Sequence, residues 1–175
     1  MRRPAQDAVS KVGCVGSQAV WHVELLADHQ ELIPAVGELR WRDWGHAPEP
    51  EDLSWLVDVT GRESGRAELP VTFVALDSDG GIAGAVGLGQ FDPAEREDRS
   101  PWVLGMIVAP EIRGQGTGRQ LLDHLCRWAG EHGHDPVWVA TGDYAVGFYR
   151  RCGWQVAETF VRSGEQIIVL SYRGG

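Results

Sequence analysis

The residues best suited to chemistry lie in a glycine-rich segment at residues 108–119. It follows the apolar run 102–108 and precedes a run with helical spacing at 120–128, so it links a predicted strand to a predicted helix. Its glycines let the backbone approach a phosphate closely, and the first N–H groups of a helix have no intrahelical acceptor. The segment therefore predicts a pyrophosphate-binding site, with Arg113 and Arg119 as flanking donors.

The spacing of these glycines excludes two common nucleotide motifs. A dinucleotide fingerprint needs a glycine where the chain has Arg119, and a P-loop needs Gly-Lys-Ser/Thr where it has Gly118-Arg119-Gln120. The segment does fit Arg/Gln-x-x-Gly-x-Gly/Ala, with Arg113, Gly116 and Gly118, after a strand ending in Val-x-Pro. At these residues the chain resembles the GNAT superfamily of acetyl-CoA-dependent N-acyltransferases, whose pyrophosphate loop has this form.

A second match lies about thirty residues further on. Residues 136–141 read as a strand, and residues 145–153 read as a short helix that carries Phe148-Tyr149 and is closed by Gly153. Trp154 then begins the next strand. The GNAT family shows the same order of strand, Phe-Tyr helix and Gly-Phe or Gly-Trp. The resemblance covers residues 71–173 well and the first seventy residues in outline.

The resemblance implies the fold and the co-substrate. Residues 1–18, with Pro4, Gly13, Gly16 and Ser17, read as a flexible arm, and the resemblance implies one α/β (α+β) domain over residues 19–175. The domain would hold a mixed, mostly antiparallel sheet of six to seven strands, splayed at the acyl-CoA site and flanked by about four helices. The backbone of Met106, Ile107 and Val108 would pair with the pantetheine of acetyl-CoA. The loop residues implied to bind the cofactor are Arg113, Gly114, Gln115, Gly116, Thr117, Gly118 and Arg119.

Hydrophobic periodicity and turn signals predict the remaining elements. The segment Asp77-Ser-Asp-Gly-Gly is a hairpin signal, and four glycines in the strand after it indicate a bent or bulged strand. In chain order we expect a strand over 19–27, a helix over 29–44, a second helix from about 48 to 58 or beyond, a polar connector over 61–68, strands over 70–76 and 81–90, a charged loop over 91–100, and strands over 154–162 and 166–172.

Tyr149 is the predicted general acid. It occupies the Tyr position of the family's Phe-Tyr pair, and in the family that phenol lies near the sulfur, where it protonates the leaving thiolate. A backbone N–H near Val108 would stabilise the thioester oxygen. The competing interpretation is that Phe148 and Tyr149 are both core aromatics; adjacent helix positions point to different faces, so one of them can be core and the other not.

The general base is less clear from the sequence. Many relatives carry a Glu on the central strand or on the strand after the loop helix, but residues 102–108 and 137–140 contain no carboxylate. The Asn that many relatives place after the fifth strand is also missing, with Gly142 there. A base acting through water is therefore expected. Asp92 is the first candidate, followed by Glu95 and Glu97, although loop carboxylates are more often simply solvated.

Aromatic residues and histidines complete the candidate sites. Trp41, Trp44 and Trp55 lie in or beside the first two predicted helices, where they would line an amine pocket, with Asp92, by cation–π contact or would simply pack. The histidines at 124, 132 and 134 lack the cysteine or carboxylate partners of a zinc site, so we expect no metal.

Composition bounds the partners. The net charge is −9 with a single lysine, Lys11, which argues against nucleic acid and would attract a cationic amine, unless it merely aids solubility. No apolar run is long enough for a membrane span, and the N-terminus lacks the apolar core of a secretion signal. Cys14, Cys126 and Cys152 show no paired spacing, so a reducing cytoplasm is expected. A homodimer is one assembly that the sequence allows.

Three functions follow from these residues. The first is an N-acetyltransferase that moves the acetyl group of acetyl-CoA directly to a primary amine of a small molecule in a ternary complex. A protein or peptide N-acetyltransferase is a variant of it, expected to show an open groove across the splayed strands. The third is a non-catalytic acyl-CoA sensor or partner-binding module, suggested by the missing carboxylate and Asn.

Overall fold

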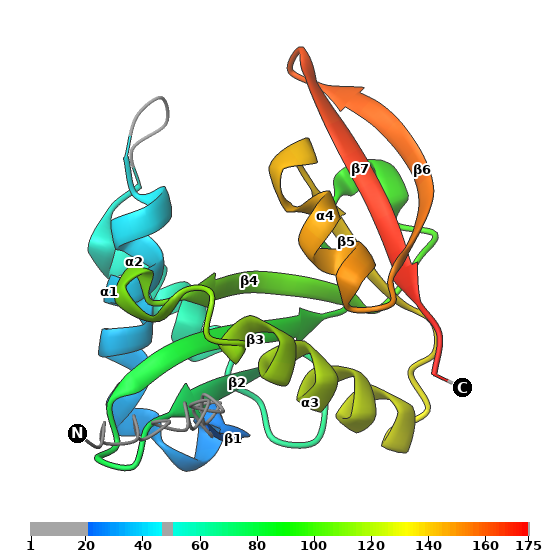
Figure 1. Ribbon diagram of the computed structural model, residues 1–175. Coiled ribbons are helices and arrows are strands. Elements are labelled where there is room, and N and C mark those ends of the chain that lie inside the picture. The colour runs from blue at the N-terminus through cyan, green and yellow to red at the C-terminus, as the bar shows by residue number, and fades with distance from the viewer. Residues whose placement is uncertain (1–20, 47–50, 175) are drawn as a thin grey trace, which may run out of the picture.

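The sheet is the frame of the molecule. In the computed structural model, which describes residues 21–46 and 51–174, the chain forms a seven-stranded sheet in the order β1-β2-β3-β4-β5-β7-β6 (Figure 1). Neighbouring strands are antiparallel except for the parallel pair β4 and β5, which confirms the predicted mixed sheet. The strands are β1 (His22–Leu25), β2 (Val71–Leu76), β3 (Ile82–Gly89), β4 (Trp102–Val108), β5 (Val137–Thr141), β6 (Gln155–Arg162) and β7 (Glu165–Tyr172).

The described residues also contain four α-helices, in agreement with the expected number. Short 3₁₀ turns connect several elements. The helices are α1 (Ile33–Trp44), α2 (Leu53–Arg62), α3 (Thr117–Glu131) and α4 (Asp143–Arg151), and the turns are η1 (Leu26–Asp28), η2 (Gln30–Leu32), η3 (Ala94–Arg96) and η4 (Pro110–Ile112).

Several predicted helix boundaries were wrong. The expected helix over 29–44 begins only at Ile33, because His29 has a non-helical backbone (φ −130°, ψ 53°) between two 3₁₀ turns. α2 extends to Arg62, into the predicted connector, and its start is capped by Asp52, whose carboxylate accepts a hydrogen bond from Ser54 N at 2.7 Å. α3 begins three residues earlier than predicted, and α4 begins at Asp143.

Helices cover both faces of the first half of the sheet. Phe73 and Ala75 of β2 pack in one cluster with α3, whereas Val74 and Leu76 pack in a second cluster with α1. This alternation follows from the two-residue period of a strand. It explains why β2 is apolar at nearly every position, since neither face is left to solvent. In Figure 1, α3 lies across β2 and β3, while α1 and α2 form a pair at the far end of β4.

The sheet opens between β4 and β5. The two parallel strands pair only at Trp102 with Trp138, near their N-terminal ends, and then diverge (Figure 1). The expected splay is therefore confirmed. β4 also carries an extra residue relative to β3 where Gly105 adopts a positive φ of 50°. The open edge of β4 beyond this bulge is where a ligand would enter the sheet.

The bent strand predicted from four glycines is β3, and its register does shift against both neighbours. A Cβ on Gly84 would lie 2.6 Å from Ile107 O, so glycine allows a close approach of β3 to β4.

Some predictions lie outside the described residues. These are the flexible arm over residues 1–18, the start of the predicted first strand before residue 21, Cys14, and the first residues of the second predicted helix at 48–50. Of the helices that the structure does describe, none has the length and apolar character needed to cross a membrane.

Candidate active site

A cavity of about 640 Å³ lies where β4, the start of α3 and α4 meet. Apart from Gln115, every residue predicted to bind the cofactor lines it. Gly114 and Gly116 adopt left-handed φ angles of 82° and 89°, and a Cβ on either would meet nothing within 4 Å. A Cβ on Gly118 would lie 3.1 Å from Met106 Cε, so this glycine allows close packing behind the loop. The loop is thus an open cradle with a tightly packed wall.

The cradle has the donors that a pyrophosphate requires. The first helical hydrogen bond of α3 joins Gln120 N to Gly116 O at 3.1 Å, which leaves the N–H groups of residues 117–119 without helical acceptors. Thr117 is 1% exposed, and its hydroxyl has no partner among the described residues. An open cradle beside an unpartnered buried hydroxyl fits a bound phosphate group. Arg119 and Arg151 add positive charge to the same cavity.

Arg113 lies differently from the prediction. Its Nε donates to Val108 O at 3.0 Å, and its Nη2 donates to the carboxylate of Asp43 at 2.6 Å. Asp43 belongs to α1 and also lines the cavity. The guanidinium therefore links the end of β4 to α1, and its charge is already partly balanced before any phosphate arrives.

The open edge of β4 presents backbone groups to the cavity. Ala109 N donates to Ala83 O at 2.9 Å, and an antiparallel ladder alternates between bonded and non-bonded pairs. The N–H and C=O of Val108 consequently point away from β3, toward the split. Those of Ile107 point to β3, so the predicted backbone contact with pantetheine rests on Met106 and Val108, while Ile107 only lines the cavity.

A second cavity, of about 320 Å³, adjoins the first. The two share part of their walls, and the members common to both are Trp44, Met106, Thr141, Tyr144 and Tyr149. Glu63 and Asp92 line only the second cavity. The first chamber thus has phosphate donors and one carboxylate, Asp43, that is paired with Arg113; the second has the carboxylates of Glu63 and Asp92, and Tyr149 lines both chambers.

Comparison with known proteins identifies the family. The sequence profile of the acetyltransferase (GNAT) family matches residues 33–154, which is most of the chain. The chain belongs to this family. It is an acetyl-CoA-dependent acetyltransferase, as the cradle and the splayed sheet indicate. No protein in a curated set matches its sequence.

Solved structures show how this acetyltransferase resembles others. An aminoglycoside 6′-N-acetyltransferase complexed with coenzyme A aligns with a TM-score of 0.72 at 11% identity, covering 87% of this chain and 96% of the other. A spermidine N-acetyltransferase chimera from Vibrio cholerae aligns with a TM-score of 0.66 at 18% identity, covering 90% and 96%. A nourseothricin acetyltransferase reaches 30% identity over 59% of this chain and 65% of its own, with a TM-score of 0.50.

Tyr149 of the acetyltransferase is a core residue that also lines both cavities. Its side chain is buried, with edge-to-face contacts to Phe148 at 5.2 Å and Trp154 at 5.4 Å between ring centroids. It nevertheless lines both cavities. Burial, helped by the nearby Tyr144, raises the pKa of the phenol well above its ordinary value, so the hydroxyl keeps its proton at neutral pH.

Of the carboxylates suggested as a base from the sequence, Asp92 lines the second cavity of the acetyltransferase. The carboxylate keeps contact with solvent, yet the surrounding protein removes enough water to raise its pKa, and Glu63 adds to the shift. Arg162 opposes it from the other side. A carboxylate with a raised pKa accepts a proton more readily than an ordinary aspartate does.

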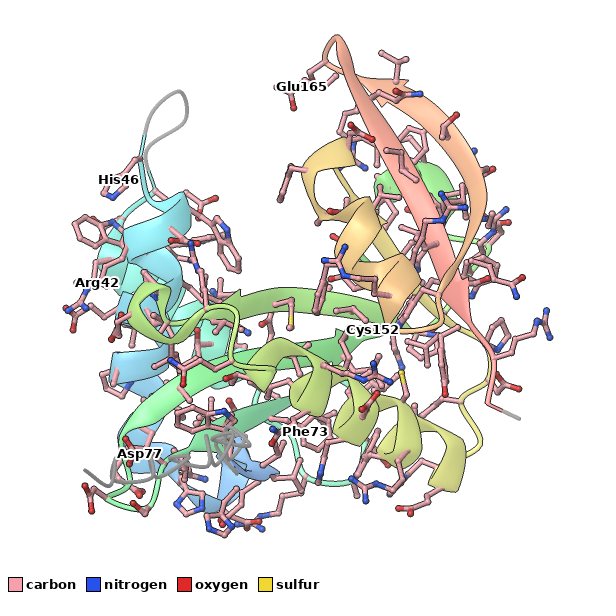
Figure 2. All side chains as sticks on the ribbon, viewed as in Figure 1. Arg42, His46, Phe73, Asp77, Cys152 and Glu165 are labelled. Atoms are coloured by element: carbon pink, nitrogen blue, oxygen red, sulfur yellow. The ribbon has the colours of Figure 1, made fainter. Side chains whose placement is uncertain are left out.

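The other carboxylates and tryptophans suggested by the sequence lie elsewhere. Glu95 is bound by Arg162 outside the cavity, and Glu97 is not among the residues lining either chamber. Trp44 lines both chambers, but Trp41 donates its indole N–H to Glu51 O at 3.0 Å and is turned away. Trp55 is about half exposed and lines neither chamber. Arg42 of α1, and His46 just after the end of α1, also point outward (Figure 2).

A charged pair at the second cavity, Arg40 with Glu63, was not predicted from the sequence. The buried Arg40 donates to Glu63 at 2.8 Å and to the hydroxyl of Thr60 at 3.0 Å, and its guanidinium lies against the bulge at Gly105. A signal was present, because Arg40 lies four residues after Val36 on the apolar face of α1, where a cation requires a partner. Glu63 lies in the segment 61–68 that was predicted to be a polar connector, where a carboxylate is ordinary, so the sequence did not mark it as a site residue.

The histidines have packing roles. His124 contacts the edge of Phe73 at 5.0 Å between centroids, and His132 stacks on Trp128 at 3.9 Å. Figure 2 places Phe73 beneath α3, consistent with this packing. Within residues 21–46 and 51–174, no three His, Cys, Asp or Glu side chains are grouped as metal ligands.

Proposed function

We propose that the acetyltransferase moves the acetyl group of acetyl-CoA directly to a primary amine of a small, cationic molecule in a ternary complex. One observation carries the proposal: a cavity with phosphate donors and a cavity with carboxylates share a wall that includes Tyr149. Two substrates held in these chambers would place their reacting groups together at the junction.

The cradle would hold acetyl-CoA through its pyrophosphate. Backbone N–H groups at the start of α3 and the hydroxyl of Thr117 would bind the phosphates, and Met106 and Val108 would pair with the pantetheine at the open edge of β4. When bound, acetyl-CoA supplies an activated acetyl thioester. The N–H of Val108 faces the split, where it would stabilise the oxygen that becomes negative during attack.

Proton transfers would use two side chains that both line the second cavity, Asp92 and Tyr149. An amine enters as an ammonium ion and must lose a proton before its lone pair can attack the thioester carbon. Asp92, directly or through water, would take that proton, and Tyr149 would protonate the departing thiolate as the carbon–sulfur bond breaks. The phenol is available as a donor because it carries its proton at neutral pH, as an ordinary tyrosine also does; burial raises its pKa and does not itself promote proton release.

Direct transfer is favoured over an acetyl-cysteine intermediate. Neither Cys126 nor Cys152 is among the residues lining the two chambers. Burial raises the pKa of the Cys126 thiol to about 12 and also raises that of Cys152, so both stay as weakly nucleophilic thiols.

The size and lining of the second cavity support a small cationic acceptor. Its volume of about 320 Å³ is at the low end for small-molecule sites. Trp44 and Tyr144 offer aromatic faces to a cation, and the carboxylates add negative charge, as does the net charge of −9. Two of the similar structures are described as acting on spermidine and on aminoglycosides, which are themselves amines.

The non-catalytic alternative loses its main motivation. It rested on a carboxylate and an Asn that are missing from the expected positions; Asp92, which lines the second cavity from a loop, would serve in place of the carboxylate. A protein or peptide acceptor stays the alternative, because both cavities are open to solvent.

Thiol release from acetyl-CoA in the presence of separate small amines tests the proposal. Benzylamine, 1,4-diaminobutane and spermidine span one to three charges and suit the volume of the cavity. We expect at least one to release coenzyme A and to gain 42 mass units per acetyl group, roughly at the turnover of ordinary enzymes. Acetyl-CoA binding with no release from any amine would favour the sensor instead.

A further inference from the structure

The loop that carries Asp92 contacts the half of the sheet to which its flanking strands do not belong. Residues 90–101 connect β3 to β4, which belong to the half that contains β1 and β2. The loop nevertheless lies against β6 and β7, in the half beyond the split (Figure 1). It therefore bridges two halves that pair as strands only at Trp102 and Trp138.

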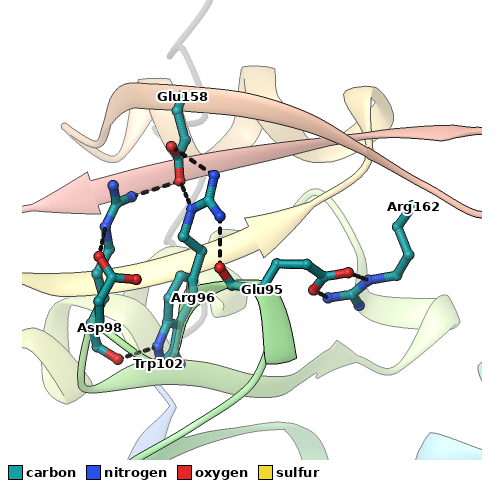
Figure 3. A network of polar contacts seen from close by, with 7 residues as sticks. Glu95, Arg96, Asp98, Trp102, Glu158 and Arg162 are labelled. Atoms are coloured by element: carbon teal, nitrogen blue, oxygen red, sulfur yellow. Dashed lines mark hydrogen bonds and ion pairs between the residues drawn. The ribbon is translucent and has the colours of Figure 1, made fainter.

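Glu158 of β6 forms the centre of this bridge (Figure 3). Its Oε2 accepts from Arg96 Nη2 at 3.0 Å, and its Oε1 accepts from Arg96 Nε and, at 2.9 Å, from Arg99 Nη1. Two guanidinium groups of the loop thus converge on one carboxylate of an outer strand. A second pair, Arg162 of β6 with Glu95 of the loop, lies further out.

The environment makes the inner contact stronger than an ordinary surface ion pair. The side chains of Glu158, Arg96 and Arg99 are 26%, 26% and 23% exposed, whereas Arg162 and Glu95 are 42% and 40% exposed. Less solvent means less screening, and a bidentate guanidinium contact fixes orientation as well as distance.

Aromatic rings hold the two arginines in place. Arg99 Cζ lies 4.6 Å from the ring centroid of Trp138, and Arg96 Cζ lies 5.2 Å from that of Phe160. The carbonyl of Arg99 accepts from Trp102 Nε1 at 2.7 Å, which ties the end of the loop to the start of β4. Arg99 thus reaches both members of the one residue pair that joins the halves of the sheet.

Asp92 depends on this attachment for its position. It lies two residues before η3, and no side-chain hydrogen bond of its own holds its carboxylate within the described part of the chain. The position of its carboxylate in the cavity is therefore determined by the backbone of the loop. The position of the loop in turn depends on its contacts with Glu158.

We infer that Glu158 is a positioning residue for acetyl transfer: by binding Arg96 and Arg99 it holds the loop so that Asp92 faces the junction of the two cavities. The inference rests on the proposed role of Asp92 as base. Glu158 lines neither cavity, so we expect its effect on acetyl transfer to pass through Asp92.

Amide hydrogen exchange, measured without any substrate, tests whether Glu158 holds the loop in place. In Glu158→Gln, the amides of residues 91–100 should exchange about threefold faster or more, while those of α3 stay unchanged. Glu165→Gln is the matched control, because Glu165 lies at the exposed tip of the β6–β7 hairpin (Figure 2). Arg96→Gln, which breaks the contact from the other side, should repeat the result of Glu158→Gln. Unchanged exchange in both variants would overturn the inference.

A double-mutant cycle tests the link to Asp92. With whichever panel amine is acetylated, Glu158→Gln should lower kcat about tenfold without changing the KM for acetyl-CoA, and it should have no further effect in an Asp92→Asn background. An equal loss in both backgrounds would show that Glu158 acts elsewhere and would overturn the inference. If Asp92→Asn itself leaves kcat unchanged, the proposed base fails, which is a separate result.

Discussion

The carboxylate of Asp43 accepts a hydrogen bond from Arg113 at 2.6 Å, across the mouth of the cofactor cavity. Arg113→Ala would leave Asp43 unpaired beside the phosphates, so we predict about fivefold to tenfold weaker acetyl-CoA binding from lost attraction and added repulsion. The double variant Arg113→Ala with Asp43→Ala should recover most of the affinity. Arg42→Ala, on the outer side of α1, is the control. Titration calorimetry with equal affinities for the single and double variants would contradict this relationship.

Gly116→Ala should abolish measurable acetyl-CoA binding while the protein stays folded. The methyl group would occupy the open cradle and would strain a residue with a left-handed φ, at a cost of about 1–2 kcal/mol. Gly133→Ala is a matched control, since Gly133 also has a left-handed φ and open space but lies after the far end of α3. Both variants should lose similar stability. If both also bind acetyl-CoA equally, the cradle is wrongly placed.

Tyr149→Phe should lower kcat by roughly 10²-fold, the low end for general acid catalysis because a thiolate leaves tolerably without an acid. The ring remains, so its contacts with Phe148 and Trp154 and the affinity for acetyl-CoA should persist. Tyr172→Phe, a ring on β7 beside Trp154, serves as the control. A Tyr149→Phe protein that melts early but turns over normally would show that this phenol serves the core alone.

Asp92→Asn should be both less active and more stable at neutral pH. The folded protein raises the pKa of Asp92 above the ordinary 3.8, so folding favours the protonated carboxyl group. Relative to the ionised form, protonated Asp92 therefore stabilises the fold at low pH, and this contribution is lost as pH rises through the raised pKa. Asn stays neutral at every pH, so the Asp92→Asn protein does not lose this stability as pH rises. The gain in melting temperature should be largest near pH 7 and vanish near pH 4. The opposite trend would show that Asp92 is stabilised as an anion.

The carboxylate of Asp92 should also determine how the activity of the wild type depends on pH. The rate should fall as pH drops through the raised pKa of Asp92, because the protonated acid cannot accept a proton from the amine. This acidic limb should disappear in Asp92→Asn, measured as kcat/KM for an acetylated amine. An identical limb in both proteins would assign it to the amine itself.

The cofactor half of the site was predictable because its signals are local. Gly116 and Gly118 imply backbone that approaches a ligand, and their place between a strand and a helix implies anion binding. The bulge at Gly105 and the unpaired edge of β4 confirm the splay expected from the resemblance. The details of Arg113 were not predictable, because its partner Asp43 is seventy residues away in the sequence.

The acceptor half depends on packing between distant elements. Trp41 and Trp44 belong to the same helix, and only the docking of α1 on the sheet decides which of them faces the cavity. Glu63 enters through the pairing of α2 with Arg40, and Asp92 through a loop held by Glu158. Apart from the helical spacing of Arg40 after Val36, these contacts leave no periodic pattern in the sequence.

Initial-rate kinetics with acetyl-CoA and an acetylated amine varied together test the central claim most directly. If the two cavities hold both substrates at their junction, double-reciprocal plots should intersect, and the intact protein should gain no mass when incubated with acetyl-CoA alone. Parallel lines, together with a protein heavier by one acetyl group, would mean that the group is first transferred to the enzyme, and would contradict direct transfer at Tyr149 and Asp92.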